Sequence, residues 1–179
     1  YNELRTIAGE KGVRFMYETT VGAGLPIIKT ISDLVLSGDR IYRIEAVLSG
    51  TLNFIFNELS PELPLSKAIR KAKEKGFTEP DPRVDLSGTD VVRKILILSR
   101  EAGYQVEMKD VEVNSFLPAE CFTGDLNDFY RKVETLDPEF EERRIDLVRR
   151  GVKWRFFAIF DNGRAKVGLE EVDRDHPSY

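Results

Sequence analysis

The sequence predicts an α+β domain with a mixed, largely antiparallel sheet and helices packed on one face of that sheet. Two observations support this prediction. Segments with helical and strand-like hydrophobic patterns are interspersed along the chain, and two apolar segments flank an Asn-Gly pair near its end. At 179 residues, 41% hydrophobic and 32% charged, the chain is long enough to bury one core and has the composition of a globular protein.

The first third of the chain combines helical and strand-like segments. Residues 1–12 have the pattern of the end of a helix, and the apolar residues 13–17 predict a short buried strand. Pro26 suits the first turn of a helix, because apolar residues follow it at helical spacing. Residues 40–49 alternate as a half-buried strand does, and Thr51 is the expected N-cap of the next helix.

The remainder of the chain is predicted to be mainly helical up to a final β-hairpin. Helical patterns cover residues 65–76, 85–103, 126–136 and 138–150. Two prolines stiffen the loop between the first two of these helices. Residues 153–160 and 164–172 form the hairpin, and Asn162 and Gly163 supply the positive φ angles of a tight turn.

Composition excludes several classes of protein. A net charge of −4 and a pI near 5.3 disfavour a general nucleic-acid binder, which carries a basic surface. No apolar run is long enough to cross a bilayer and no secretory signal opens the chain, so we expect no membrane partner and a cytoplasmic location. The single cysteine, Cys121, excludes an intrachain disulfide. The single histidine, His176, is assigned no role, and no cluster has the spacing of zinc ligands.

Acidic residues and one lysine gather between positions 79 and 94. Glu79, Asp81 and Asp85 lie on the proline-stiffened loop and at the start of the next helix. Asp90 and Lys94 are four residues apart and share a helix face. A partly buried lysine oriented by an acid can pass a proton to or from an alcohol or carbonyl oxygen, and nearby carboxylates can bind a substrate ammonium. From spacing alone, a surface ion pair and an ordinary turn are the commoner interpretations.

Two glycine-containing segments are further candidates. The carbonyls of VGAGLP, residues 21–26, can bind a monovalent cation, or its amides and the following helix start can bind an anion. This segment lacks the G-x-G-x-x-G spacing of a dinucleotide site, and a tight turn is the alternative. Gly50 and Thr51 offer amides and a hydroxyl to an anionic group, or form an ordinary helix cap.

Together, the segments YETTVGAGLPII, VLSGTLNFIF and KGFTEPDPRVDLSGTDVVRKILILSREAG resemble homoserine dehydrogenases in order and spacing. The similarity runs from about Phe15 to Pro118 and continues weakly to the end. Its details are most similar to the form fused to an aspartokinase in a bifunctional enzyme. The resemblance implies interconversion of aspartate 4-semialdehyde and homoserine with NADPH or NADH, in threonine and methionine biosynthesis.

The resemblance also implies roles for individual residues. Lys94 matches the lysine that donates a proton to the aldehyde oxygen, and Asp90 matches the acid that holds this lysine and touches the substrate. The other matches to the substrate pocket are Glu79, which binds the substrate amino group, Asp85, Gly50 and Thr51. The backbone carbonyls that match a sodium site are those of Glu18, Val21, Ala23 and Leu25.

By resemblance, the chain is the substrate domain of a two-domain dehydrogenase, truncated at both ends. Residues 1–12 then form the end of a helix linking from an absent nucleotide-binding domain, and residues 13–179 form the catalytic and dimerisation domain. We therefore expect the chain to be inactive alone and to form a homodimer through its sheet.

Two other interpretations stay open. One is a non-catalytic amino-acid-binding or dimerisation module of the same fold, which a dispensable Lys94 would favour. The other is a different dehydrogenase whose substrate domain shares the α+β plan. Glu79 and Asp90 favour an amino-acid substrate over a phosphorylated one, which would require clustered Arg or Lys.

Overall fold

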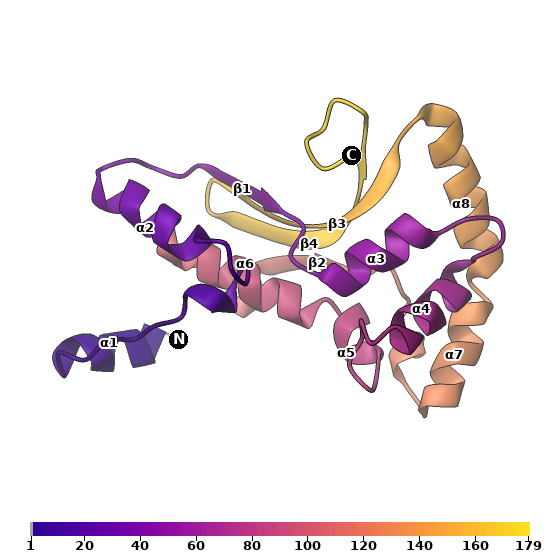
Figure 1. Cartoon of the computed structure of the whole chain (residues 1–179), viewed down its shortest axis with the longest axis horizontal. Helices are drawn as coiled ribbons and strands as arrows, with labels where there is room; N and C mark the ends of the chain where they lie inside the picture. The colour runs from indigo at the N-terminus through magenta and orange to yellow at the C-terminus, as the bar shows by residue number, and fades with distance from the viewer. Residues whose placement is uncertain (1) are drawn as a thin grey trace.

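A four-stranded sheet organises the molecule (Figure 1). The computed structural model describes the backbone of residues 2–179 and the side chains of residues 3–179. The strand order is β1 (Arg43–Ala46), β3 (Lys153–Asp161), β4 (Arg164–Val172) and β2 (Val111–Asn114). β3 pairs antiparallel with both β1 and β4, whereas β2 runs parallel to β4. The sheet is therefore mixed and largely antiparallel, which confirms the predicted fold class.

The β3–β4 hairpin forms the centre of the sheet. Asn162 (φ 46°) and Gly163 (φ 89°) make its tight turn, as predicted. Alternate side chains of β3 point to opposite faces. Phe156 and Phe160 belong to the main core, whereas Phe157 packs in a separate cluster on the other face.

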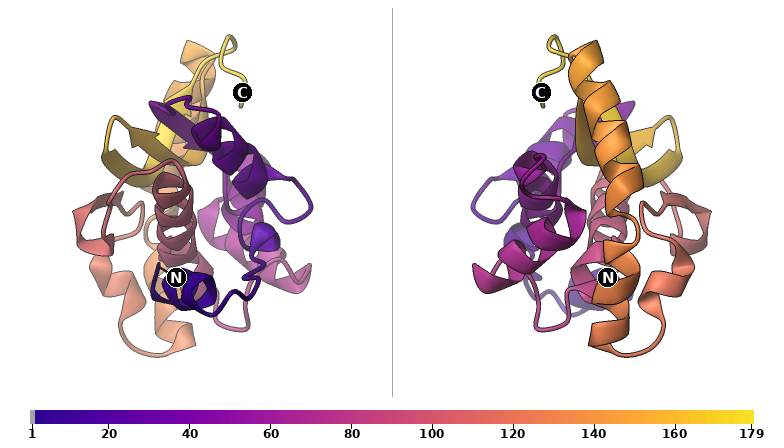
Figure 2. Two further views of the ribbon diagram at one scale, coloured as in Figure 1. Left: turned by 90° about the vertical axis from the view of Figure 1, so that its left-hand side faces the viewer. Right: turned by 90° about the vertical axis from the view of Figure 1, so that its right-hand side faces the viewer.

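Helices cover one face of this sheet. The described residues form the helices α1 (Asn2–Glu10), α2 (Ile27–Leu36), α3 (Gly50–Glu58), α4 (Leu65–Glu74), α5 (Arg83–Leu86), α6 (Thr89–Glu101), α7 (Leu126–Glu134) and α8 (Asp137–Arg150), with 3-10 turns η1 (Glu18–Thr20), η2 (Met108–Asp110) and η3 (Ala119–Phe122). Helix α6 runs beneath β3 and β4, and Val91, Ile95 and Leu98 on it are buried (Figure 1). The side views place the C-terminus on the far side of the sheet from α6 (Figure 2).

Several predicted boundaries are confirmed. Helix α2 begins directly after Pro26, and Gly38 (φ 88°) follows its end. Helix α4 ends before Gly76 (φ 72°), and α7 and α8 lie where the two charged helices are predicted. No helix in residues 2–179 is both long enough and apolar enough to span a membrane.

Residues 13–17 do not form the predicted buried strand. They make an extended connection in which the side chains of Val13 and Met16 are 61% and 82% exposed. An apolar run becomes a strand only where a neighbouring strand completes its hydrogen bonds, and this segment has no such neighbour among the described residues.

The other differences concern where elements begin and end. Ser49, not Thr51, caps α3, because its hydroxyl accepts a hydrogen bond from the amide of Leu52 at 3.2 Å. The helix predicted over residues 85–103 is divided into α5 and α6 at Gly88, whose φ of 71° breaks the helical path. Strand β1 has four residues instead of the ten predicted, and strand β2 was not predicted.

Candidate active site

Lys94 lies on α6 and is held by two acceptors. Its ammonium nitrogen is 2.7 Å from Oδ2 of Asp90, one helical turn earlier, and 2.9 Å from the carbonyl oxygen of Leu48. The Lys94 side chain is 26% exposed and that of Asp90 is 62% exposed. The predicted pair is therefore present, and the contact with Leu48 distinguishes it from a free surface ion pair. An ammonium has three N–H groups and the described residues accept from two of them, so one N–H remains for a ligand.

Asp85 joins the loop that carries Glu79 to the start of α3. One carboxylate oxygen of Asp85 accepts a hydrogen bond from the amide of Glu79 at 2.8 Å, and the other lies 3.3 Å from the hydroxyl of Thr51. The Thr51 hydroxyl also donates to the carbonyl of Phe77. These contacts fix the path of the loop, while the Glu79 side chain itself is exposed.

The start of α3 connects these two groups of residues. Leu48, which binds Lys94, and Thr51, which contacts Asp85, lie three residues apart on either side of the cap residue Ser49. The structure thus brings Lys94 with Asp90, and Asp85 with the backbone of Glu79, to one short segment. Within residues 3–179, the Glu79 carboxylate makes no ion pair with Lys94 or with any other residue.

An open cavity of about 610 Å³ adjoins the start of α3. Its lining residues are Gly50, Thr51, Asn53, Phe54, Asn57, Gly76 and Phe77. The first amides of a helix have no acceptor inside the helix, so this end of α3 can donate to a ligand carboxylate. Gly50 and Thr51, predicted to line a substrate pocket, do line this cavity.

The glycine loop before α2 has a different arrangement. Gly22 (φ 82°) and Ala23 (φ 50°) fold it tightly. The carboxylate of Glu18 accepts hydrogen bonds from the amides of Ile28 at 3.0 Å and Lys29 at 2.9 Å. This internal carboxylate occupies the start of α2, so the alternative of an external anion there is wrong. The backbone carbonyls of the loop remain candidates for a cation.

Asp81 and His176 each have a partner within the described residues. The Arg83 guanidinium hydrogen-bonds to Asp81 and holds the pKa of that carboxyl below its usual range. Cys121 is buried as a free thiol. Nε2 of His176 lies 2.7 Å from Oε1 of Glu45, on the open face of the sheet. Among the described residues, no group of three or more His, Cys, Asp or Glu side chains could hold a metal ion.

The comparisons with known proteins identify the family. The family model described as homoserine dehydrogenase matches residues 26–179. This match covers most of the chain, so the chain belongs to the homoserine dehydrogenase family, as the resemblance indicated.

The relatives include fused enzymes. The chain is 45% identical to a bifunctional aspartokinase/homoserine dehydrogenase of Haemophilus influenzae over 180 residues, which cover 100% of the chain and 22% of that protein. It is 42% identical to bifunctional aspartokinase/homoserine dehydrogenase 2 of Escherichia coli over 178 residues, covering 99% of the chain and 22% of that protein. The chain thus spans about a fifth of the length of these relatives.

Solved structures share the fold. A Candida auris protein of unknown function superposes with a TM-score of 0.83 at 38% identity, over 90% of this chain and 47% of that chain. A hyperthermophilic archaeal homoserine dehydrogenase in complex with NADPH superposes with a TM-score of 0.70 at 28% identity, over 99% of this chain and 46% of that chain.

Proposed function

We propose that this chain provides the substrate-binding and proton-transfer part of a homoserine dehydrogenase, which interconverts aspartate 4-semialdehyde and homoserine. The observation that supports this most directly is the half-buried ammonium of Lys94, which Asp90 and the Leu48 carbonyl hold while one N–H has no acceptor among the described residues. Family membership supplies the reaction class.

Lys94 has the proton-transfer role in this proposal. A bound nicotinamide would supply the hydride when the semialdehyde is reduced. Lys94 then gives one proton to the carbonyl oxygen, so aldehyde, hydride and proton together form the alcohol. In the reverse direction the neutral amine accepts the hydroxyl proton. Asp90 keeps the amine oriented and is exposed enough to contact the substrate.

The substrate amino group is assigned to Glu79. Its exposed carboxylate has no internal ion-pair partner among residues 3–179, so it is available to an ammonium. Asp85 supports Glu79 by fixing its backbone, and Gly50 and Thr51 line the adjoining cavity. A carboxylate for the ammonium and a helix start for the substrate carboxylate suit an amino acid at both ends.

We place NADP or NAD mainly outside this chain. A relative of similar fold was solved with NADPH, and this chain covers 46% of it. Residues 1–12 are then the end of a connection from a nucleotide-binding domain, and residues 13–179 are the catalytic and dimerisation domain. The low cysteine content agrees with a cytoplasmic enzyme.

A sodium ion is proposed for the backbone carbonyls of Glu18, Val21, Ala23 and Leu25. Four uncharged oxygens suit a hard monovalent cation. The positive φ angle of Ala23 turns this segment sharply, and the Glu18 side chain is committed to α2, which leaves its carbonyl as the donor. The ion would hold the turn that leads into α2.

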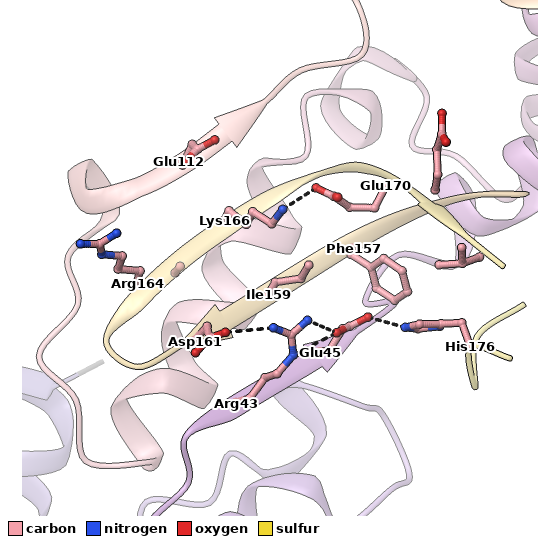
Figure 3. A pocket seen from close by; sticks show the side chains of 13 residues that line it. Arg43, Glu45, Glu112, Phe157, Ile159, Asp161, Arg164, Lys166, Glu170 and His176 are labelled. Carbon is pink, nitrogen blue, oxygen red and sulfur yellow. Dashed lines mark hydrogen bonds and ion pairs between the residues drawn. The ribbon is translucent and has the colours of Figure 1, made fainter. Parts of the chain in front are cut away.

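A homodimer is proposed through the open face of the sheet. Phe157 and Ile159 lie in a hollow of about 530 Å³ on this face, with charged side chains around them (Figure 3). Apolar side chains inside a charged rim are typical of an interface. The other face of the sheet is already covered by helices of this chain.

The test is Lys94→Ala in the complete protein that contains the nucleotide-binding part. We expect kcat/KM to fall by a factor on the order of 10² to 10⁴, while affinity for NADPH and the circular dichroism spectrum stay the same. Lys29→Ala is the matched control, because Lys29 forms an exposed i,i+4 pair with Asp33 and is not assigned to catalysis. Undiminished turnover in Lys94→Ala would favour the non-catalytic module instead.

A further inference from the structure

Glu101 is a buried carboxylate at the last residue of α6. Its side chain is only 1% exposed, and burial raises the pKa of this carboxyl. The position is also unfavourable because the C-terminal end of a helix carries partial negative charge. A buried carboxylate at such a place needs strong hydrogen-bond donors to keep it ionised.

Among the residues whose side chains are described, donors from three separate segments reach Glu101. Nη1 of Arg5 on α1 donates at 2.8 Å and the hydroxyl of Tyr17 donates at 3.0 Å, both to Oε1. The hydroxyl of Ser32 on α2 donates to Oε2 at 2.8 Å. The carboxylate of Glu101 therefore links three segments to the end of α6. They are α1, the connection that precedes η1, and α2.

Helix α1 depends strongly on this contact for its orientation. It lies apart from the sheet at the N-terminal edge of the molecule (Figure 1). Ala8 is buried, but Leu4 and Ile7 are 56% and 44% exposed, so little apolar packing within the described residues fixes the helix. The ion pair between Arg5 and Glu101 is consequently a main restraint on its direction.

The same helix carries the proposed proton donor. Lys94 and Glu101 are seven residues apart, which is two helical turns, so they lie on the same side of α6. The interior of α6 is packed against the sheet, and its two ends therefore move together. Any segment held by Glu101 is held at a fixed position relative to Lys94.

We propose that Glu101 is a positioning residue that sets the approach of the nucleotide-binding part to Lys94. It does so by fixing α1 and the connection to α2 against the helix that carries the proton donor. This inference rests on the proposed function, in which residues 1–12 lead from the nucleotide-binding part. Glu101 itself touches neither substrate nor cofactor.

The experiment uses Glu101→Gln in the complete protein. Gln has the same shape, but its NH2 group cannot accept and it removes the charge that pairs with Arg5. We expect kcat to fall by a factor on the order of ten to a hundred, because a shift of about 1 Å between reacting groups has an effect of this size. KM for homoserine should stay unchanged. The deuterium isotope effect on kcat, measured with homoserine deuterated at the oxidised carbon, should rise.

The isotope effect separates positioning from simple loss of structure. A variant that is only partly folded has less active enzyme, but its remaining molecules show the wild-type isotope effect. Glu107→Gln is the matched control, because it removes a more exposed pair with Arg100 near the end of the same helix, and Glu107 makes no hydrogen bond or ion pair with α1 or α2 among the described residues. Glu107→Gln should change neither kcat nor the isotope effect.

Arg5→Gln provides a second variant if Glu101→Gln fails to fold. The Arg5 side chain is 53% exposed, so its replacement leaves the core intact, and we expect the same changes at smaller size. Wild-type kcat and isotope effect in Arg5→Gln and in any folded Glu101→Gln would overturn the inference, as would a lowered melting temperature alone. Since Lys94→Ala tests the reaction separately, an active Lys94→Ala enzyme would instead refute the proposed function.

Discussion

The two faces of the central hairpin are built from similar residues but have different surroundings. On the helix-covered face, Phe156 and Phe160 are at most 2% exposed and pack in the main core. On the open face, Phe157 and Ile159 are also buried, but they join a small cluster covered by C-terminal residues. The same alternating strand thus packs against the main core on one face and against a small local cluster on the other.

Charged residues add to the contrast. Arg43 binds Asp161 at 2.9 Å and Glu45 at 2.5 Å, and all three line the hollow beside Phe157 (Figure 3). The helix-covered face has no corresponding group of ion pairs among the residues described. Burial alone therefore does not show which face of the sheet stabilises the fold. An apolar cluster surrounded by ion pairs is equally suited to contact with another chain.

The largest expected effect is on the helix-covered face. Phe156→Ala should lower the free energy of unfolding by about 3–5 kcal/mol, because it leaves a cavity among rings such as that of Phe116. Phe157→Ala should have a smaller effect, because His176 and nearby terminal residues can close over the space. Urea unfolding, at a protein concentration where the protein is monomeric, measures the loss of unfolding free energy in both variants. Equal losses would remove the distinction between the faces.

A charge on the open face should affect assembly more than folding. Ile159→Glu places a third carboxylate near Glu45 and Asp161, so we expect the dimer dissociation constant to rise at least about a hundredfold. Light scattering over a concentration series measures this change, and circular dichroism checks the fold. Val148→Glu, at a 65% exposed position on α8, should leave the mass unchanged. A wild-type dimer in Ile159→Glu would contradict the proposed interface.

The smallest expected effect concerns the ionic rim. Burial opposes ionisation of Glu45, but hydrogen bonds from Arg43 and His176 outweigh it and hold the pKa of Glu45 below its usual range. A lowered folded-state pKa gives stability above the unfolded-state pKa, and this stability is lost as the pH falls through the folded-state pKa.

Glu45→Gln should therefore lower the free energy of unfolding by less than about 1 kcal/mol at pH 7. The difference from the wild type should shrink as the pH is lowered below about 4. Urea unfolding at both pH values measures it. Glu139→Gln breaks an exposed pair with Arg143 and should show no such dependence. A constant difference at all pH values would rule out the ionised Glu45 as its source.

Elements with local signals were predictable from the sequence. Pro26 and Gly38 bound α2, and Asn162 with Gly163 gives the hairpin, because each acts through its own backbone angles. Strand β2 could not be predicted in this way. It exists because residues 111–114 pair with residues 165–168, and nothing within four residues specifies a distant partner.

The contacts of the candidate site also differ in whether a local signal predicts them. The spacing of Asp90 and Lys94 is local, and their ion pair was predicted. The contact of Lys94 with Leu48 spans 46 residues, and that of Thr51 with Asp85 spans 34, so neither could be read from a motif. The Glu101 contacts were missed for the same reason, since Arg5 lies 96 residues away.

The strand order also determines when the sheet can form. Both edge strands, β1 and β2, precede the central β3–β4 hairpin in the chain, and each pairs only with a strand of that hairpin. During synthesis neither edge strand has a partner until residues 153–172 have left the ribosome. The helices that cover the sheet therefore keep their apolar sides exposed until this hairpin is available to complete the core.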